Sequence, residues 1–201
     1  MNATHARTHA PAGEASDVAG EMAATLAHAA LAFADEDAAL SRRYWSKAKQ
    51  AYDLTGVHEK SFRSSSDTIS EVAAYYVSGA VITHVFFAAA SLYTAALELE
   101  PGAADGFRAD AMELAVMQEA NGGQQWYWEV PGWDNAWWDG ALLMAAQGIK
   151  GPDIDDNPAF FNQLGVFVDK WVNVQAPIEC VPPLLAAHAS PAFLRVCLTA
   201  R

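Results

Sequence analysis

The chain has 201 residues, of which 52% are apolar, and a formal net charge of -12 at neutral pH. A chain of this length can form one domain with a sizeable core. The negative charge argues against nucleic acid or an anionic membrane as a partner, since both require a basic surface. Nine Phe, seven Trp and six Tyr indicate a folded chain, because disordered chains are poor in aromatic residues.

The two cysteines, Cys180 and Cys197, stand in no C-x-x-C pair and have no His at metal-ligand spacing. We expect buried thiols, with a disulfide left open. The first residues contain no apolar stretch typical of a secretory signal. Residues 77–97 are the most apolar run, but His84, Ser91 and many small residues favour a buried helix over a membrane span. The sequence therefore predicts a soluble protein.

The first half of the chain reads as helices. Residues 1–15 are predicted to be a disordered tail. Ser16 or Asp17 then offers an N-cap to a helix whose apolar residues recur at helical spacing: Val18, Met22, Leu26, Ala29 and Phe33. A second helix follows Asp35 and presents Leu40, Tyr44, Ala48 and Tyr52 on one face. Two helices with so short a link predict an antiparallel hairpin.

The rest of the chain continues the pattern. A polar loop over 55–67 precedes a third helix at 80–98, which is apolar nearly all round and ends before Pro101-Gly102. Further helices are predicted from the same kinds of signal at 105–120, 140–146, 158–171 and 192–200. No stretch alternates with the period of a strand, and no repeat of fixed length is visible. The fold class is therefore all-α, and helical hairpins arranged around a closed toroid fit it.

One segment, residues 131–146, carries the clearest functional signal. Asp134 or Asn135 is predicted to cap the small, apolar helix that follows. Trp133 stands before that cap, where an indole ring could stack on a flat ligand, although a Trp is more often simply part of a core. Trp126 and Trp128 form a second aromatic group, equally suited to a sugar platform or to covering exposed apolar surface.

Five segments, taken together and in order, resemble the glycoside hydrolase family 9 endoglucanases. Residues 16–24 are similar to the family's S-D-V-A-G-E-T-A-A helix, and 48–52 to its A-K-Q-L-Y. Residues 133–135 with 141–143 resemble its S-W-D-N-K and V-L-L-A. Residues 177–182 are similar to its P-I-Q-Y-T-P, and 194–195 to the L-R of its W-G-S-L-R. The resemblance covers most of residues 16–201 and implies a partial catalytic domain, an incomplete (α/α)6 barrel.

The resemblance also implies an activity and shows where this sequence departs from it. Members of the family cleave β-1,4-glucan by inversion, which needs two carboxyl groups about 6.5 to 9.5 Å apart. The family's D-A-G-D motif, its H-R motif and its C-terminal Glu motif are absent from these residues. We therefore expect no catalytic residue here, and we interpret acidic residues such as Glu21 and Asp139 as members of a solvated face. A truncated gene model, or a segment that acts together with missing flanking sequence, would each give this pattern.

The ligands that follow from this reading are few. Trp133, Trp128 and Trp126 are predicted to contact a β-1,4-glucan oligosaccharide or polysaccharide. In some members of the family a calcium ion is held near an S-G-Y-x-D-E-L segment. Here Ile82, Thr83 and His84 stand where the acidic pair falls, and a hard cation prefers carboxylates, so no metal and no other cofactor is expected. His28 and His84 are interpreted as structural histidines. The family is usually secreted, but the sequence leaves the location open.

Two alternatives stay open. The chain could be a non-catalytic helical module that binds a carbohydrate or a protein, with self-association through an exposed barrel interior. It could also be a helical bundle unrelated to cellulases, since Ala-rich helices resemble one another easily.

Overall fold

A computed structural model describes residues 12–68, 77–120 and 135–148. Within these ranges the chain forms α1 (Ser16–Ala32), α2 (Ala38–Asp53), a short α3 (Ser65–Thr68), α5 (Val81–Leu99), α6 (Pro101–Ala120) and α7 (Trp137–Ala146). No strand occurs in the described part of the chain. The predicted helices beyond residue 148 lie outside the described residues, as do both cysteines.

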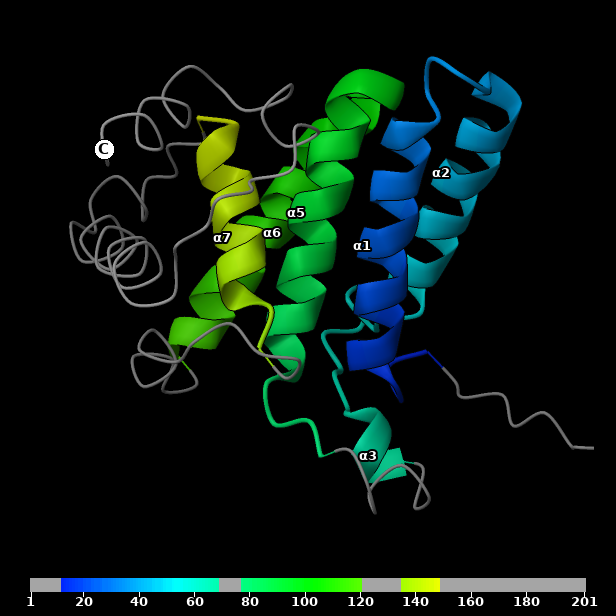
Figure 1. Ribbon diagram of the computed structural model, residues 1–201. Coiled ribbons are helices and arrows are strands. Elements are labelled where there is room, and N and C mark those ends of the chain that lie inside the picture. Colours follow the sequence, from blue (N-terminus) through cyan, green and yellow to red (C-terminus); the bar gives the residue numbers. More distant parts are fainter. Residues whose placement is uncertain (1–11, 69–76, 121–134, 149–201) are drawn as a thin grey trace, which may run out of the picture.

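The long helices form two layers (Figure 1). α1, α5 and α7 lie side by side and run in the same direction, with α5 in the middle and in contact with both neighbours. We call these three the inner layer. α2 folds back against α1, and α6 folds back against α5, so the predicted antiparallel hairpin of α1 and α2 is confirmed.

The outer helices touch each other through long side chains. The Tyr52 hydroxyl lies 3.1 Å from Asp110 Oδ2, and Phe107 of α6 packs edge-on against both Tyr52 and Trp45 of α2. Glu100 accepts hydrogen bonds from Trp45 Nε1 and Lys49 Nζ, and the pKa of Glu100 is lowered, first by the Lys49 bond and then by the Trp45 bond. These pairs join the hairpin of α1 and α2 to the hairpin of α5 and α6.

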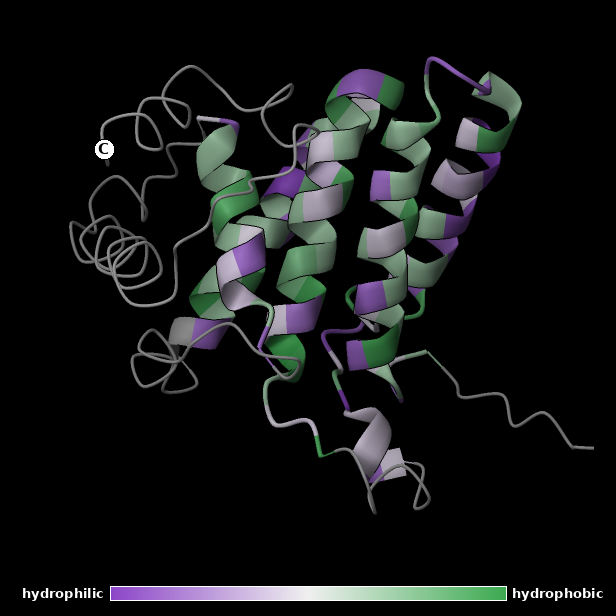
Figure 2. Ribbon diagram, viewed as in Figure 1, coloured by the Kyte–Doolittle hydropathy of each residue, from purple (hydrophilic) through white to green (hydrophobic). Residues whose placement is uncertain are grey.

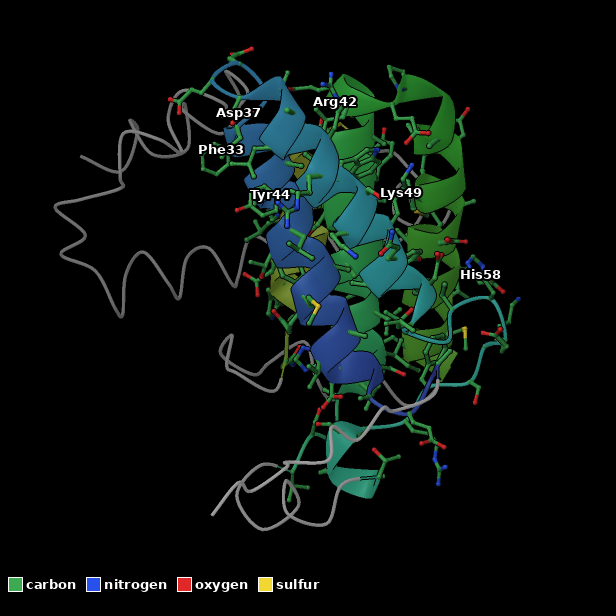
Figure 3. The ribbon with its side chains drawn as sticks, turned by 90° about the vertical axis from the view of Figure 1, so that its right-hand side faces the viewer. Phe33, Asp37, Arg42, Tyr44, Lys49 and His58 are labelled. Atoms are coloured by element: carbon green, nitrogen blue, oxygen red, sulfur yellow. The ribbon has the colours of Figure 1, made fainter. Side chains whose placement is uncertain are left out.

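Hydropathy follows the layers (Figure 2): α5 is mostly hydrophobic, whereas α2 carries bands of hydrophilic residues. Figure 3 places Phe33 and Tyr44 beside each other near the turn between α1 and α2, away from His58. Their ring centroids are 5.8 Å apart. Asp37 caps α2 by accepting the backbone N–H groups of Ala39 and Leu40. By length and composition α5 could cross a membrane, but 67% of its most apolar window is buried in the fold.

The face that α1 buries differs from the one predicted. Gly20, Ala23, Ala24, Ala27 and Ala30 are buried, whereas Val18 and Met22 are about half exposed. The reason is that α1 meets α5 at backbone distance, which only small residues allow. Ser16 and Asp17 also do not cap α1; they bond instead to the loop before α3.

The predicted loop ahead of α6 is also corrected. Pro101 is the first residue of α6, four residues before the predicted start. Proline suits this position because it has no backbone N–H to leave unpaired and its φ is already helical. Ahead of α1, Gly13 is buried and its N–H donates to the Leu54 carbonyl, although the predicted boundary at residue 15 stays a prediction.

Candidate functional site

The predicted glucan-contacting residues, Trp126, Trp128 and Trp133, lie outside the described residues. The structure describes the chain from Asn135, where it enters α7. Asn135 is buried, and its Oδ1 accepts the backbone N–H of Trp137 at 3.0 Å. The N-cap itself is Ala136, so Asn135, one of the two predicted N-caps, lies one residue ahead of the cap. The Ala136 N–H donates to Thr83 Oγ1 of α5 at 3.3 Å. The start of α7 is thereby fixed to the start of α5.

The residues at this end of the inner layer leave polar atoms unused. Within the described residues, Ser78 Oγ ahead of α5, His84 Nε2 in its first turn and Asn135 Nδ2 ahead of α7 are buried without a hydrogen-bond partner. A buried polar atom without a partner costs about 1 to 3 kcal/mol. Three such atoms therefore lie near the N-terminal ends of α5 and α7, and a fourth, Ser91 Oγ, lies in the middle of α5.

His84 lies at the centre of the inner layer. Its side chain is 1% exposed, and its Nδ1 lies 2.7 Å from Glu21 Oε1 on α1. Asp139 of α7 is exposed. Partial burial of its carboxyl group raises the pKa of Asp139 first, the negative charge of Glu21 raises it further, and His84 lowers it. Among these three groups the structure describes one direct contact, between His84 and Glu21.

Two glycines set how closely the inner helices approach one another. A Cβ at Gly20 would lie 2.7 Å from the His84 carbonyl oxygen, so α1 crosses α5 with the backbones nearly touching. A Cβ at Gly140 would lie 2.7 Å from the Phe86 ring and 3.2 Å from the Phe87 Cα, so α7 also packs closely on α5. Glu21 follows Gly20 in sequence, and its side chain reaches His84.

The interpretation of the acidic residues as members of a solvated face agrees with the structure, because Asp139 is exposed and the Glu21 side chain is 46% exposed. The contact of Glu21 with His84 was not predicted, since the two residues are 63 positions apart. The structural interpretation of His84 fits its burial and its paired Nδ1, although Nε2 has no partner in the part described. His28 matches its structural interpretation: burial lowers its pKa, and its ring packs at 6.3 Å from Phe87.

The described helices place the protein in the class of folds built from helical hairpins. The inner helices α1, α5 and α7 are parallel, and the outer helices α2 and α6 run antiparallel to them. The sequence profile of Glycosyl hydrolase family 9 matches residues 2–180. The chain belongs to this family. It has no match among curated protein sequences.

A solved structure gives the same answer for the fold. An endoglucanase from the termite Nasutitermes takasagoensis, at pH 2.5, matches with a TM-score of 0.58 and 24% sequence identity. The match covers 80% of this chain and 33% of the endoglucanase, so the chain spans about a third of that protein's length. The predicted family and the predicted partial (α/α)6 barrel are confirmed, and an unrelated helical bundle is excluded.

The residues near the start of α5 do not fit the calcium ion held by some members of the family. Thr83 Oγ1 donates to the Ala80 carbonyl and accepts the Ala136 N–H, and His84 Nδ1 faces Glu21. Calcium prefers several carboxylate and carbonyl oxygens. Among the residues that the structure describes, no group of three or more His, Cys, Asp or Glu side chains could hold a metal ion.

Proposed function

We propose that this chain is part of an endo-β-1,4-glucanase whose complete catalytic domain hydrolyses cellulose-like glucan by inversion. The observation that carries the proposal is the family match over residues 2–180. The likeness to the termite endoglucanase supports the barrel architecture that such a domain requires.

Within this proposal, Trp133, Trp128 and Trp126 contact the glucan. Indole rings suit this task because they present a large flat apolar surface with little conformational entropy to lose. Trp133 precedes Asn135 by two residues, and Asn135 leads into α7, which is fixed to α5. A rigid support of this kind would hold an aromatic group in place for a sugar ring.

The 201-residue chain by itself is proposed to bind glucan without cleaving it. Inverting hydrolysis requires a general acid and a general base on opposite sides of the sugar. The proposal takes the family's D-A-G-D motif and C-terminal Glu motif, neither of which occurs in these 201 residues, as the source of both groups.

The test is calorimetric titration of the 201-residue chain with cellohexaose, together with an assay for new reducing ends on carboxymethyl-cellulose. We expect weak binding and no cleavage. Trp133→Ala should weaken binding about fivefold, since stacking on one aromatic ring contributes about 1 kcal/mol. Tyr44→Ala is the matched control, because Tyr44 is an outer-layer aromatic residue that pairs with Phe33.

Measured hydrolysis by the purified chain would contradict the proposal that these 201 residues are inactive. It would not contradict the proposal that they belong to a glucanase. Absence of any glucan binding, or equal binding by Trp133→Ala and the wild type, would remove the proposed aromatic contact.

The alternative from another class is a non-catalytic module that associates with itself or with another protein. The exposed Val18 and Met22 on α1 favour it, because no described helix covers them. A monomer with glucan affinity supports the first proposal, and an oligomer without glucan affinity supports the second.

A further inference from the structure

α2 is a basic helix in a chain that is otherwise strongly acidic. The 201 residues include 24 acidic and 12 basic side chains, yet four of those 12 lie between positions 42 and 49. No acidic residue occurs between Asp37, the N-cap of α2, and Asp53, its last residue. The helix is therefore a local region of positive charge on an acidic protein.

The basic side chains of α2 divide into two groups. Lys49 is used within the fold, because it pairs with Glu100 at the start of α6. Arg42, Arg43 and Lys47 are exposed, and in the part of the chain that the structure describes none of them forms an ion pair. These three positive charges are thus available to a partner.

The three charges share the solvent-facing side of α2 with two neutral polar residues, Ser46 and Gln50. We call Arg42, Arg43, Ser46, Lys47 and Gln50 the basic stripe. Residues three and four apart adjoin one another on a helix, so the stripe is continuous and extends about 12 Å along the axis. Lys47 Nζ donates to Gln50 Oε1 at 2.9 Å, and Gln50 Nε2 donates to Ser46 Oγ at 3.4 Å. Figure 3 views the protein from the α2 side and shows the helix at the surface, with Arg42 labelled on it.

Helix stability does not explain the stripe. Arg43 and Lys47 stand four residues apart, where two like charges destabilise a helix. Ser46, at the centre, is a poorer helix former than alanine. The stripe instead presents a row of hydrogen-bond donors. Each guanidinium group can hold a carboxylate through two N–H groups, and the neutral hydroxyl and amide suit the hydroxyl groups of a sugar.

We propose that the basic stripe binds a linear polysaccharide that carries carboxylate groups, such as a polymer of uronic acids. Charge complementarity selects an anionic partner. The choice of a sugar polymer rests on the proposed glucanase function, because a glucanase acts among polysaccharides. The stripe differs in chemistry from the aromatic contacts proposed for neutral glucan, so it is a second recognition surface.

The partner has to be narrow. Asp35 and Glu36 precede the stripe, Asp53 follows it, and the chain as a whole has a net charge of -12. Charges act over about 8 Å at physiological ionic strength. A single polymer strand on the stripe therefore lies close to the three basic side chains and beyond the reach of most carboxylates. A membrane or a nucleic-acid duplex presents a wide negative surface, which the rest of this acidic protein repels.

The test is titration calorimetry of the 201-residue chain with polygalacturonate at about 25 mM and about 300 mM NaCl. We expect binding at the lower salt concentration and much weaker binding at the higher one, because salt screens exposed charges. Arg42→Gln combined with Arg43→Gln should weaken binding about fourfold, since an exposed ion pair contributes a factor of about two. Adding Lys47→Gln should bring the loss to about eightfold. Lys60→Gln combined with Arg63→Gln is the matched control, because it removes two positive charges from exposed residues outside the stripe. The control should leave the affinity unchanged.

The substituted side chains are all exposed, so we expect every variant to fold. Affinity for cellohexaose, which is neutral, should be the same in all of them. Failure of the proposed glucan contact and failure of the stripe therefore give different results. Absence of polygalacturonate binding at low salt, binding that does not depend on salt, or equal weakening by the control pair would each overturn the proposal. Tighter binding to polyglutamate than to polygalacturonate would also overturn it and would assign the stripe to an acidic protein.

Discussion

At the scale of single residues, the best-defined polar contact joins the start of α1 to the start of α3. Asp17 is 1% exposed; its Oδ1 accepts the Ser65 backbone N–H at 2.9 Å, and its Oδ2 accepts the Ser65 hydroxyl at 2.7 Å. The carboxylate also lies in the first turn of α1, where the helix dipole favours negative charge. Asp17 therefore links α1 to α3, two segments that are distant in sequence.

We expect Asp17→Ala to lower the free energy of unfolding by about 2 to 4 kcal/mol, because it removes two charge-assisted hydrogen bonds and leaves a buried N–H unpaired. Urea unfolding at pH 7 measures the loss. Asp35→Ala, in the exposed turn after α1, should change stability by less than about 0.5 kcal/mol. Equal losses in the two variants would show that the Ser65 contact contributes little.

Residue-scale prediction from the sequence succeeded only in part, even where the signal is local. The Asn135 side chain does bond to the first residue of α7, but the N-cap is the next residue, Ala136. The partner of Asp17 did not follow, because Ser65 is 48 positions away and a serine-rich segment does not indicate what it will bind. The same holds for His84, whose acidic partner Glu21 is 63 positions away on α1.

At the scale of elements, glycines set the distance between inner helices. Gly20 of α1 is the point of closest approach to α5, whereas Gly106 of α6 has no atom within 4 Å of where a Cβ would stand. The two positions are both inside helices and differ in surroundings. They form a natural matched pair.

We expect Gly20→Ala to destabilise the protein by about 1 to 3 kcal/mol, since the new Cβ would meet the His84 carbonyl and force α1 away from α5. Gly106→Ala should stabilise it by about 0.5 to 1 kcal/mol, because alanine favours helix and the site is open. Thermal unfolding of both variants beside the wild type checks the pair. A loss at Gly106 as large as that at Gly20 would mean that helix packing is not the cause.

Helix positions were predictable from the apolar period, but the buried face of α1 was not. The period of Val18 and Met22 suggested a core face, yet the Ala and Gly residues of the adjoining face are the buried ones. Valine is more hydrophobic than alanine, so a hydrophobic pattern favours burying valine. At a close helix crossing, however, the smaller alanine fits and valine does not. A sequence pattern cannot state how near two helices will come.

At the scale of the whole molecule, no described helix covers one edge of the inner layer. Val18 and Met22 are 49% and 52% exposed and stand four residues apart, so they share one face of α1. The chain spans about a third of the termite endoglucanase it resembles, so further inner helices of a complete barrel have no counterpart in this match. An uncovered apolar edge of this kind promotes association.

We expect the 201-residue chain to associate with itself at micromolar concentration, and we expect the double variant Val18→Glu and Met22→Glu to be monomeric at the same concentration. Sedimentation velocity measures both. Leu54→Glu is the control, because Leu54 is also exposed, at 51%, but follows α2. A wild type that stays monomeric up to about 100 μM would show that this edge does not drive association.

The central position of α5 has a consequence for the order in which the chain becomes stable during synthesis. α1 and α2 leave the ribosome first, yet the residues of α1 that pack at Gly20 find their partner only when α5 follows. The first hairpin alone therefore leaves its small-residue face uncovered, and a nascent chain that ends before residue 99 is open to proteolysis and to chaperones. Once α5 has been synthesised, α1, α6 and α7 can all pack against it. The described helices therefore depend on α5, which lies in the middle of their order along the chain.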